Sequence, residues 1–150
     1  MNNGKYCPEI VSKVERAYLA GIIDGEGYIA VYRHYQNKSG TFGYRLRVGV
    51  TNTDKDLILW LHGKFAGQFC DGRIGGEGYK PRYDVVWYSS HACKVLKLAL
   101  PYLKSKKLKA EIAIEFGARK HFGQRTLDEK VYENNVFEKF KVLNKRGALI

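Results

Sequence analysis

The chain has 150 residues, a length typical of one domain that folds without stabilising disulfide bonds or metal ions. Its 26 Lys and Arg against 15 Asp and Glu give a formal net charge of +11, which favours a polyanion as partner. No apolar run reaches the ~18 residues of a membrane span, and residues 1–8 lack the apolar centre of a signal peptide. The Cys and His residues do not have the spacing of a zinc site. These features argue against a membrane protein and a zinc finger, and we expect a soluble intracellular protein.

The first half of the sequence predicts a helix followed by a hairpin. The helix covers residues 12–24, and Ser12 and Glu15 form a capping box at its start. Beyond it the apolar period changes to two, which predicts strands at 28–35 and 44–51 joined by a polar turn. The hairpin therefore begins directly after the first helix.

Alternation in the second strand of this hairpin assigns its two faces. Leu46 and Val48 point to one side and Arg45 and Arg47 to the other, so we expect the arginines to face outward. A two-stranded ribbon fits the major groove of DNA, where arginine bonds guanine bidentately. An ordinary solvated basic face is the alternative for each single residue. The candidate DNA contacts on this hairpin are Tyr28, Tyr32, His34, Arg45 and Arg47.

The remaining predicted elements are a helix from Thr53 or Asp54 to Gly67, a hairpin of strands at 69–74 and 82–88, and helices at about 89–100, 106–120 and 127–144. Ser89 or Ser90 is expected to cap the third helix, and Pro101 to end it. The order predicts an α+β fold in which helices cover one face of a four-stranded antiparallel sheet. Candidate DNA contacts in the second hairpin are Arg73, Lys80, Arg82 and Trp87.

The most informative segment is Leu19–Gly27, which reads LAGIIDGEG. Helical spacing places Ala17, Ala20, Gly21 and Asp24 on one face. Side chains this small fill a core poorly, but they let another helix backbone approach closely. The segment therefore predicts a helix that packs tightly against a second helix.

An acidic pair, Asp24 and Glu26, lies at the C-terminal end of this helix, where it alternates with Gly25 and Gly27. Glycines can adopt backbone angles that other residues resist, which suits a helix end. Carboxylates at a helix C-terminus oppose its dipole. We therefore expect an adjacent cation or a partner's backbone donors to compensate for them.

This segment resembles the signature motif of the LAGLIDADG homing endonucleases. The matching residues are Leu19, Ala20, Gly21, Asp24, Gly25 and Gly27. Ile22 and Ile23 are conservative variants, and Glu26 stands where the family carries Asp or Glu. The resemblance covers about residues 14–120 and implies an αββαββα core, with a C-terminal helical extension from about residue 121. A small-residue helix end with a surface carboxylate is the alternative interpretation.

The chain carries one copy of the motif, since the similar Gly76-Glu77-Gly78 lacks a preceding small-residue helix. Single-motif chains of this family form two-fold symmetric dimers in which motif helices pack together. The resemblance therefore implies a homodimer and a pseudo-palindromic DNA target. The dimer interface is assigned to Ala17, Ala20, Gly21 and Asp24.

The resemblance also implies catalytic groups. Glu26 of each subunit would bind Mg²⁺ with the Gly25 carbonyl as a second contact, and Mn²⁺ or Ca²⁺ could occupy the same site. Asn52, at the end of the second strand, takes the place of a polar residue that orders water. Lys106 follows a Pro-aromatic-Leu segment and takes the place of a lysine that stabilises the transition state. Lys109, in the same lysine-rich region, is assigned to a DNA phosphate.

The implied function is a metal-dependent, site-specific double-strand DNA endonuclease, encoded within a mobile intron or intein. Two alternatives use the same fold: an RNA-binding intron maturase and a catalytically silent DNA-binding regulator. The joint presence of Glu26, Asn52 and Lys106 favours catalysis. No membrane partner and no small-molecule cofactor are expected.

Overall fold

The computed structural model describes residues 11–36, 40–73, 75–119 and 125–145. The elements are α1 (Lys13–Glu26), β1 (Gly27–Gln36), β2 (Thr41–Asn52), α2 (Lys55–Phe65), β3 (Gln68–Arg73), β4 (Arg82–Tyr88), α3 (Ser89–Ala99), the 3₁₀ turn η2 (Leu100–Tyr102), α4 (Lys107–Ala118) and α5 (Leu127–Leu143). Every helix and strand expected from the sequence is present, with bounds that shift by a few residues. None of these helices combines the length and apolar character needed to cross a bilayer.

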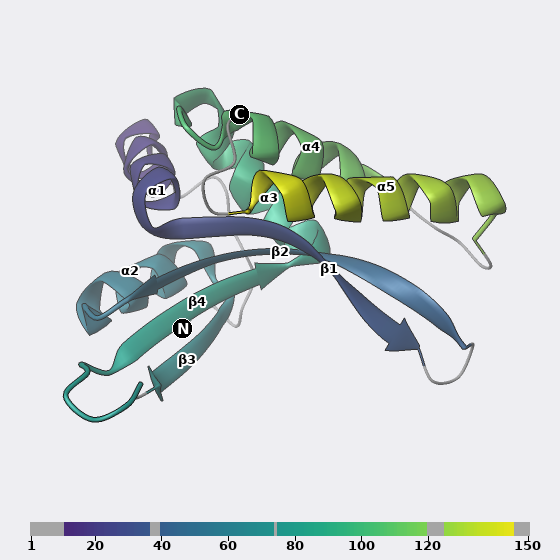
Figure 1. Ribbon diagram of the computed structural model, residues 1–150. Coiled ribbons are helices and arrows are strands. Elements are labelled where there is room, and N and C mark those ends of the chain that lie inside the picture. Colours follow the sequence, from purple (N-terminus) through teal and green to yellow (C-terminus); the bar gives the residue numbers. More distant parts are fainter. Residues whose placement is uncertain (1–10, 37–39, 74, 120–124, 146–150) are drawn as a thin grey trace.

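The four strands form one antiparallel sheet in the order β1-β2-β4-β3. Helices α1, α3, α4 and α5 lie above this sheet in Figure 1, and α2 packs on β2, β3 and β4 through the same hydrophobic core. This arrangement confirms the predicted α+β fold, with one covered and one uncovered face. The uncovered face is called the open face below.

The core lies between the sheet and the helices. Alternate residues of the first hairpin, Ile29, Leu46 and Val48, are at most 1% exposed, so the predicted assignment of faces is correct. Trp87 is also fully buried, and its Nε1 donates hydrogen bonds to the carbonyls of Phe65 (3.0 Å) and Ala66 (3.1 Å). The prediction that Trp87 contacts DNA is therefore wrong, because its ring anchors α2 to the inner face of β4.

Helix capping follows the sequence at α2 and only in part elsewhere. Asp54 accepts a hydrogen bond from the Leu57 amide at the start of α2. At α1 Ser12 accepts one from the Glu15 amide, but the Glu15 carboxylate pairs with Lys64 (3.1 Å), so half of the expected capping box forms. Neither Ser89 nor Ser90 caps α3, which differs from the expectation. The N-cap residue is Tyr88, which makes no side-chain cap bond, and Ser89 is already the first helical residue.

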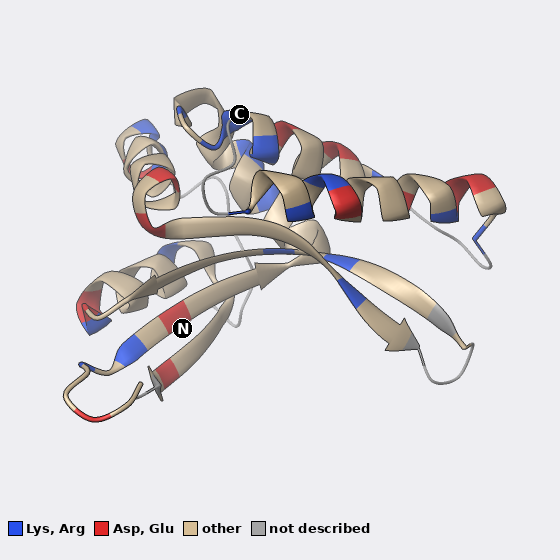
Figure 2. Ribbon diagram, in the orientation of Figure 1, with Lys and Arg blue, Asp and Glu red and all other residues tan. Residues whose placement is uncertain are grey.

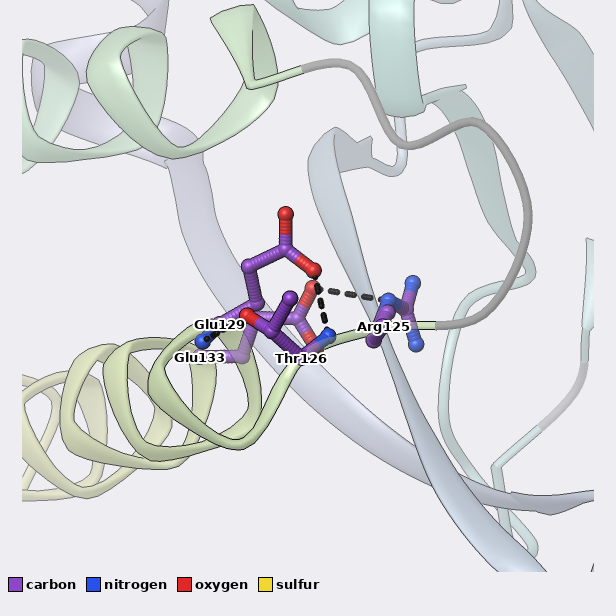
Figure 3. A network of polar contacts seen from close by, with 4 residues as sticks. All are labelled: Arg125, Thr126, Glu129 and Glu133. Atoms are coloured by element: carbon purple, nitrogen blue, oxygen red, sulfur yellow. Dashed lines mark hydrogen bonds and ion pairs between the residues drawn. The ribbon is translucent and has the colours of Figure 1, made fainter.

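Helix α5 begins with a capping box that the sequence analysis did not identify. Figure 3 shows the Thr126 amide donating to the Glu129 carboxylate (2.7 Å), while the Glu129 amide donates to the Thr126 hydroxyl (3.2 Å). Beside it, Arg125 Nε pairs with the buried Glu133 carboxylate at 3.0 Å. These bonds fix the start of the helix that packs across β1.

Replacing Thr126 by Ala should lower the free energy of unfolding by about 1 kcal/mol, because one orphan amide at the start of α5 loses its acceptor. Urea unfolding followed by circular dichroism measures the change. Thr53→Ala is the matched control: Asp54, and not Thr53, caps α2, so this variant should unfold like the wild type. Equal losses from the two variants would show that the cap bond does not stabilise α5.

Candidate active site

Helix α1 continues through Gly25 and ends at Glu26, two residues later than predicted. Neither Gly25 nor Gly27 adopts a positive φ, so the expectation of unusual backbone angles at these glycines is wrong. Gly27 is needed for close approach, since a Cβ there would lie 2.8 Å from the Ile23 Cα and 3.3 Å from the Gly49 carbonyl oxygen. A Cβ on Gly25 would meet no atom within 4 Å, so the chain itself leaves space at that point.

One face of α1 is exposed within the described chain, apart from an edge contact in which the ring centroids of Tyr18 and Trp60 lie 5.3 Å apart. At Gly21, as at Gly25, an added Cβ would meet nothing within 4 Å. Val14 is 78% and Tyr18 53% exposed, and Ala17 lies on the same stripe at helical spacing. These five residues, Val14, Ala17, Tyr18, Gly21 and Gly25, are called the outer stripe of α1.

Ala20 does not belong to the outer stripe. It is fully buried inside the protomer, where it joins the hydrophobic core. The assignment of Ala20 to a dimer interface is therefore wrong. Its small size lets α1 pack closely on its own chain, and Gly21, the next residue, points away from that core.

Asp24 bonds to a loop 80 to 82 residues further along the chain. Its carboxylate accepts hydrogen bonds from the backbone amides of Lys104 (2.8 Å) and Lys106 (3.0 Å) and from the Ser105 hydroxyl (3.2 Å). Burial raises the pKa of Asp24, but these hydrogen bonds outweigh it and hold the pKa below its ordinary value. The Asp24 carboxylate thus holds the loop between η2 and α4 onto α1, and its assignment to a helix-helix interface stays a prediction.

Lys106 supplies the cation expected at the C-terminus of α1. Its Nζ donates to the carbonyl oxygens of Ile23 (2.8 Å) and Asp24 (2.7 Å). Burial and the nearby Lys109 lower the pKa of Lys106, whereas the carboxylates of Asp24 and Glu26 oppose that shift. Lys106 and Glu26 are therefore electrostatic neighbours, as their assignment to one site requires. Figure 2 shows acidic residues where α1 joins β1.

Replacing Asp24 by Ala should lower the free energy of unfolding by about 2 kcal/mol, because two backbone amides and one hydroxyl lose a charged acceptor. Ser105→Ala removes one of these three bonds and should cost less than half as much. Chemical denaturation of both variants provides the measurement. If Asp24→Ala were as stable as the wild type, the loop before α4 would not be held by this carboxylate.

Asn52 has a bond that sequence reasoning missed. Its Oδ1 accepts from the Asp54 amide (2.8 Å), which shapes the turn from β2 into α2. Strand alternation places Thr51, not Asn52, on the same face as the arginines, and the Thr51 hydroxyl donates to the carboxylate of Asp84. Asn52 therefore lies on the opposite face of β2 from the arginines, at the last residue of that strand, and its assignment to the ordering of water stays a prediction.

The open face carries most of the expected DNA contacts. Tyr28, Tyr32 and His34 of β1 alternate with the buried residues of that strand, and Arg45 and Arg47 are exposed on β2. Bands of Arg cross β2 and the start of β4 in Figure 2, whereas Arg33, the basic residue of β1, lies 5.1 Å from the ring of Phe137 on α5. Arg82 is exposed at the start of β4 and Lys80 in the loop before it, whereas the side chain of Arg73 lies outside the described residues.

No protein-family model and no curated protein sequence matches the chain. The fold nevertheless matches that of the homing endonuclease I-CvuI in complex with its target, with a TM-score of 0.74 and 17% identity over 92% of this chain and 87% of that one. It also matches the archaeal intron-encoded homing endonuclease I-Vdi141I complexed with DNA (TM-score 0.72, 13% identity, 89% and 86%).

A third match is the LAGLIDADG homing endonuclease I-LtrWI bound to target DNA, with a TM-score of 0.58 and 20% identity. Here 90% of this chain covers only 46% of the other, so the chain corresponds to about half of I-LtrWI. Together with the segment Leu19–Gly27 on α1, these matches establish that the chain has the fold of the LAGLIDADG homing endonucleases.

Proposed function

We propose that the protein is a site-specific double-strand DNA endonuclease that acts as a homodimer with Mg²⁺. The observation that carries this proposal is the position of Glu26, at the point where the helix with the outer stripe enters a sheet with an open basic face. The comparison structures I-CvuI, I-Vdi141I and I-LtrWI contain DNA, which supports the same substrate for this chain. The net charge of +11 favours the same polyanion.

The outer stripe supports a two-fold dimer. Gly21 and Gly25 leave space beside α1, so the α1 helix of a second copy can approach at backbone distance. Two-fold packing of this kind places the same residues of both chains against each other. Glu26 follows Gly25 directly, so the two copies of Glu26 would lie near the dimer axis, one for each DNA strand.

The residues at the end of α1 fit Mg²⁺ as a ligand. Asp24 and Lys106 bond within the chain, which leaves the exposed Glu26 carboxylate and the Gly25 carbonyl as hard oxygen donors. Within the described ranges no three His, Cys, Asp or Glu side chains gather into a metal cluster, so the ion would also rely on the second subunit and on phosphate oxygens. Mn²⁺ and Ca²⁺ favour the same donors.

Each remaining residue of the site has a distinct task. Bound Mg²⁺ would stabilise the negative charge that develops on the phosphoryl group during hydrolysis. Lys106 holds the last carbonyls of α1 and keeps a positive potential beside Glu26. The open face would lie in the major groove, where Arg45 and Arg47 are placed to bond guanine edges. A two-fold dimer would read a pseudo-palindromic site, because each half-site meets an identical reading surface.

Arg45 and Lys109 should make different kinds of DNA contact. Arg45→Ala should cost about 1 to 3 kcal/mol at one base pair of each half-site and relax preference there. Lys109→Ala should weaken binding to all sequences and reduce the slope of log affinity against log salt by about one unit. Titrations of the target and its single-base variants across a salt series measure both effects. A uniform loss from Arg45→Ala, with no base pair relaxed, would refute base reading by this residue.

Incubation with Mg²⁺ and a randomised duplex library, followed by sequencing of the cut ends, tests the proposed function. We expect cut ends that share one pseudo-palindromic sequence, and no cutting in EDTA. A parallel incubation with structured RNA provides the comparison with the maturase alternative. Tight RNA binding with no DNA cut under any divalent ion would contradict the endonuclease proposal.

A further inference from the structure

The Tyr28 ring lies over Gly49, in the space that a side chain at residue 49 would occupy. The two residues are paired across β1 and β2 in the antiparallel register. A Cβ on Gly49 would lie within 2.8 Å of three atoms of the Tyr28 side chain, including the hydroxyl oxygen. The tyrosine ring therefore lies across the strand, directly over the glycine, and any larger residue at this position would displace it.

The Tyr28 ring is in contact with Arg47. The guanidinium carbon of Arg47 lies 5.0 Å from the centroid of the Tyr28 ring. Burial raises the pKa of the Tyr28 hydroxyl, and Arg47 only partly opposes this shift, so the hydroxyl stays protonated at neutral pH. Arg47 is thus held by the tyrosine ring while the residue remains exposed.

Arg45, two residues away on the same face, is held less closely. Its guanidinium carbon lies 6.0 Å from the ring of Tyr88, a residue that sequence reasoning did not assign to this face. Tyr88 pairs with Arg47 in the β2–β4 register, so tyrosines flank Arg47 on both neighbouring strands. The two arginines, equivalent in the sequence pattern, therefore differ in how firmly the free protein fixes them.

We infer that Tyr28, whose ring lies over Gly49, is a positioning residue. It fixes the Arg47 guanidinium for bidentate recognition of one guanine in each half-site. This inference rests on the proposed DNA binding and refines it. A free arginine loses many rotamers when it binds, and a side chain ordered in advance loses fewer. Contact with the tyrosine ring keeps the guanidinium on the exposed face of the sheet, where its planar N–H fork can meet a base edge. Tyr28 would then act through Arg47 and need not itself read a base.

Single-base substitution of the target duplex tests the inference in DNA. Arg47→Ala should relax preference at one base pair by about 10- to 100-fold. Gly49→Ala and Tyr28→Ala should each relax the same base pair by about tenfold, because both release Arg47. Gly49→Ala should add nothing in the Tyr28→Ala background, where no ring remains to be displaced. Preference at the base pair read by Arg45 should stay unchanged. Gly63→Ala, at an exposed glycine with space around it, is the matched control.

Nitrogen-15 relaxation of the arginine Nε–Hε groups in the free protein provides a readout that does not depend on DNA. We expect an ordered Arg47 in the wild type and a mobile one in Gly49→Ala and Tyr28→Ala, with Arg45 mobile in all three. An Arg47 that stays equally ordered in both variants would overturn the inference, as would equal loss of preference at every base pair. If the wild type bound no duplex, the proposed function would fail, and the relaxation data would still show whether Tyr28 holds Arg47.

Discussion

Replacing Glu26 by Gln should remove DNA cleavage and leave the fold and the DNA affinity nearly unchanged. Glu26 is exposed at the last position of α1, and its volume is almost the same as that of glutamine. The change deletes one charged oxygen ligand of the proposed Mg²⁺ site. Metal stabilisation of a transition state amounts to several kcal/mol, so the cleavage rate should fall on the order of 1,000-fold or more.

The measurement is single-turnover cleavage of the target duplex, with affinity followed in parallel by fluorescence anisotropy. Glu77→Gln is the matched control, since Gly76-Glu77-Gly78 repeats the same tripeptide in an exposed loop before β4. That variant should cut at the wild-type rate. Wild-type cleavage by Glu26→Gln would disprove the metal-site assignment.

Replacing Gly21 by Leu should separate the two subunits. Because no atom of the protomer lies within 4 Å of a Cβ at this position, the chain itself should fold normally. A leucine would force apart two helix backbones that meet at the outer stripe, which costs about 1 to 3 kcal/mol or more. Dimerisation should weaken by roughly 10- to 100-fold, and double-strand cleavage should fall with it.

Sedimentation velocity over a concentration series measures this change. Gly63→Leu makes the same substitution at an exposed glycine of α2 that also has no atom within 4 Å of its Cβ. It should sediment as the wild type does. Should Gly21→Leu dimerise and cut as before, the model of paired α1 helices would be wrong.

The sequence alone predicted the elements of the fold because their signals are local. The change from a helical period to a period of two marks the junction after Glu26, and alternation along β2 places Arg45 and Arg47 on the open face. The motif at the end of α1 likewise located Glu26 without reference to any distant residue. Periodicity therefore sufficed for the architecture, and the catalytic role that the motif assigns to Glu26 stays a prediction.

Contacts with distant partners could not be predicted from the sequence. Asp24 bonds a loop about 80 residues away, and nothing in its local sequence indicates that partner. Ala20 is small enough for either a core or an interface, so its size did not discriminate between them. In β4 apolar residues occupy both faces, which hid the fact that Trp87 points inward. Asn52 was placed by resemblance, and its bond to the Asp54 amide, which shapes the turn into α2, was not predicted.

In the proposed dimer two copies of Glu26 each cut one DNA strand beside a paired α1 helix. The most direct measurement uses a heterodimer of one wild-type and one Glu26→Gln subunit, isolated through two different affinity tags and added to a supercoiled plasmid that carries the target. This heterodimer should nick the plasmid to the open circle and form almost no linear product. Linear product at the rate of the wild-type homodimer would contradict this proposal, because a single Glu26 would then suffice for both strands.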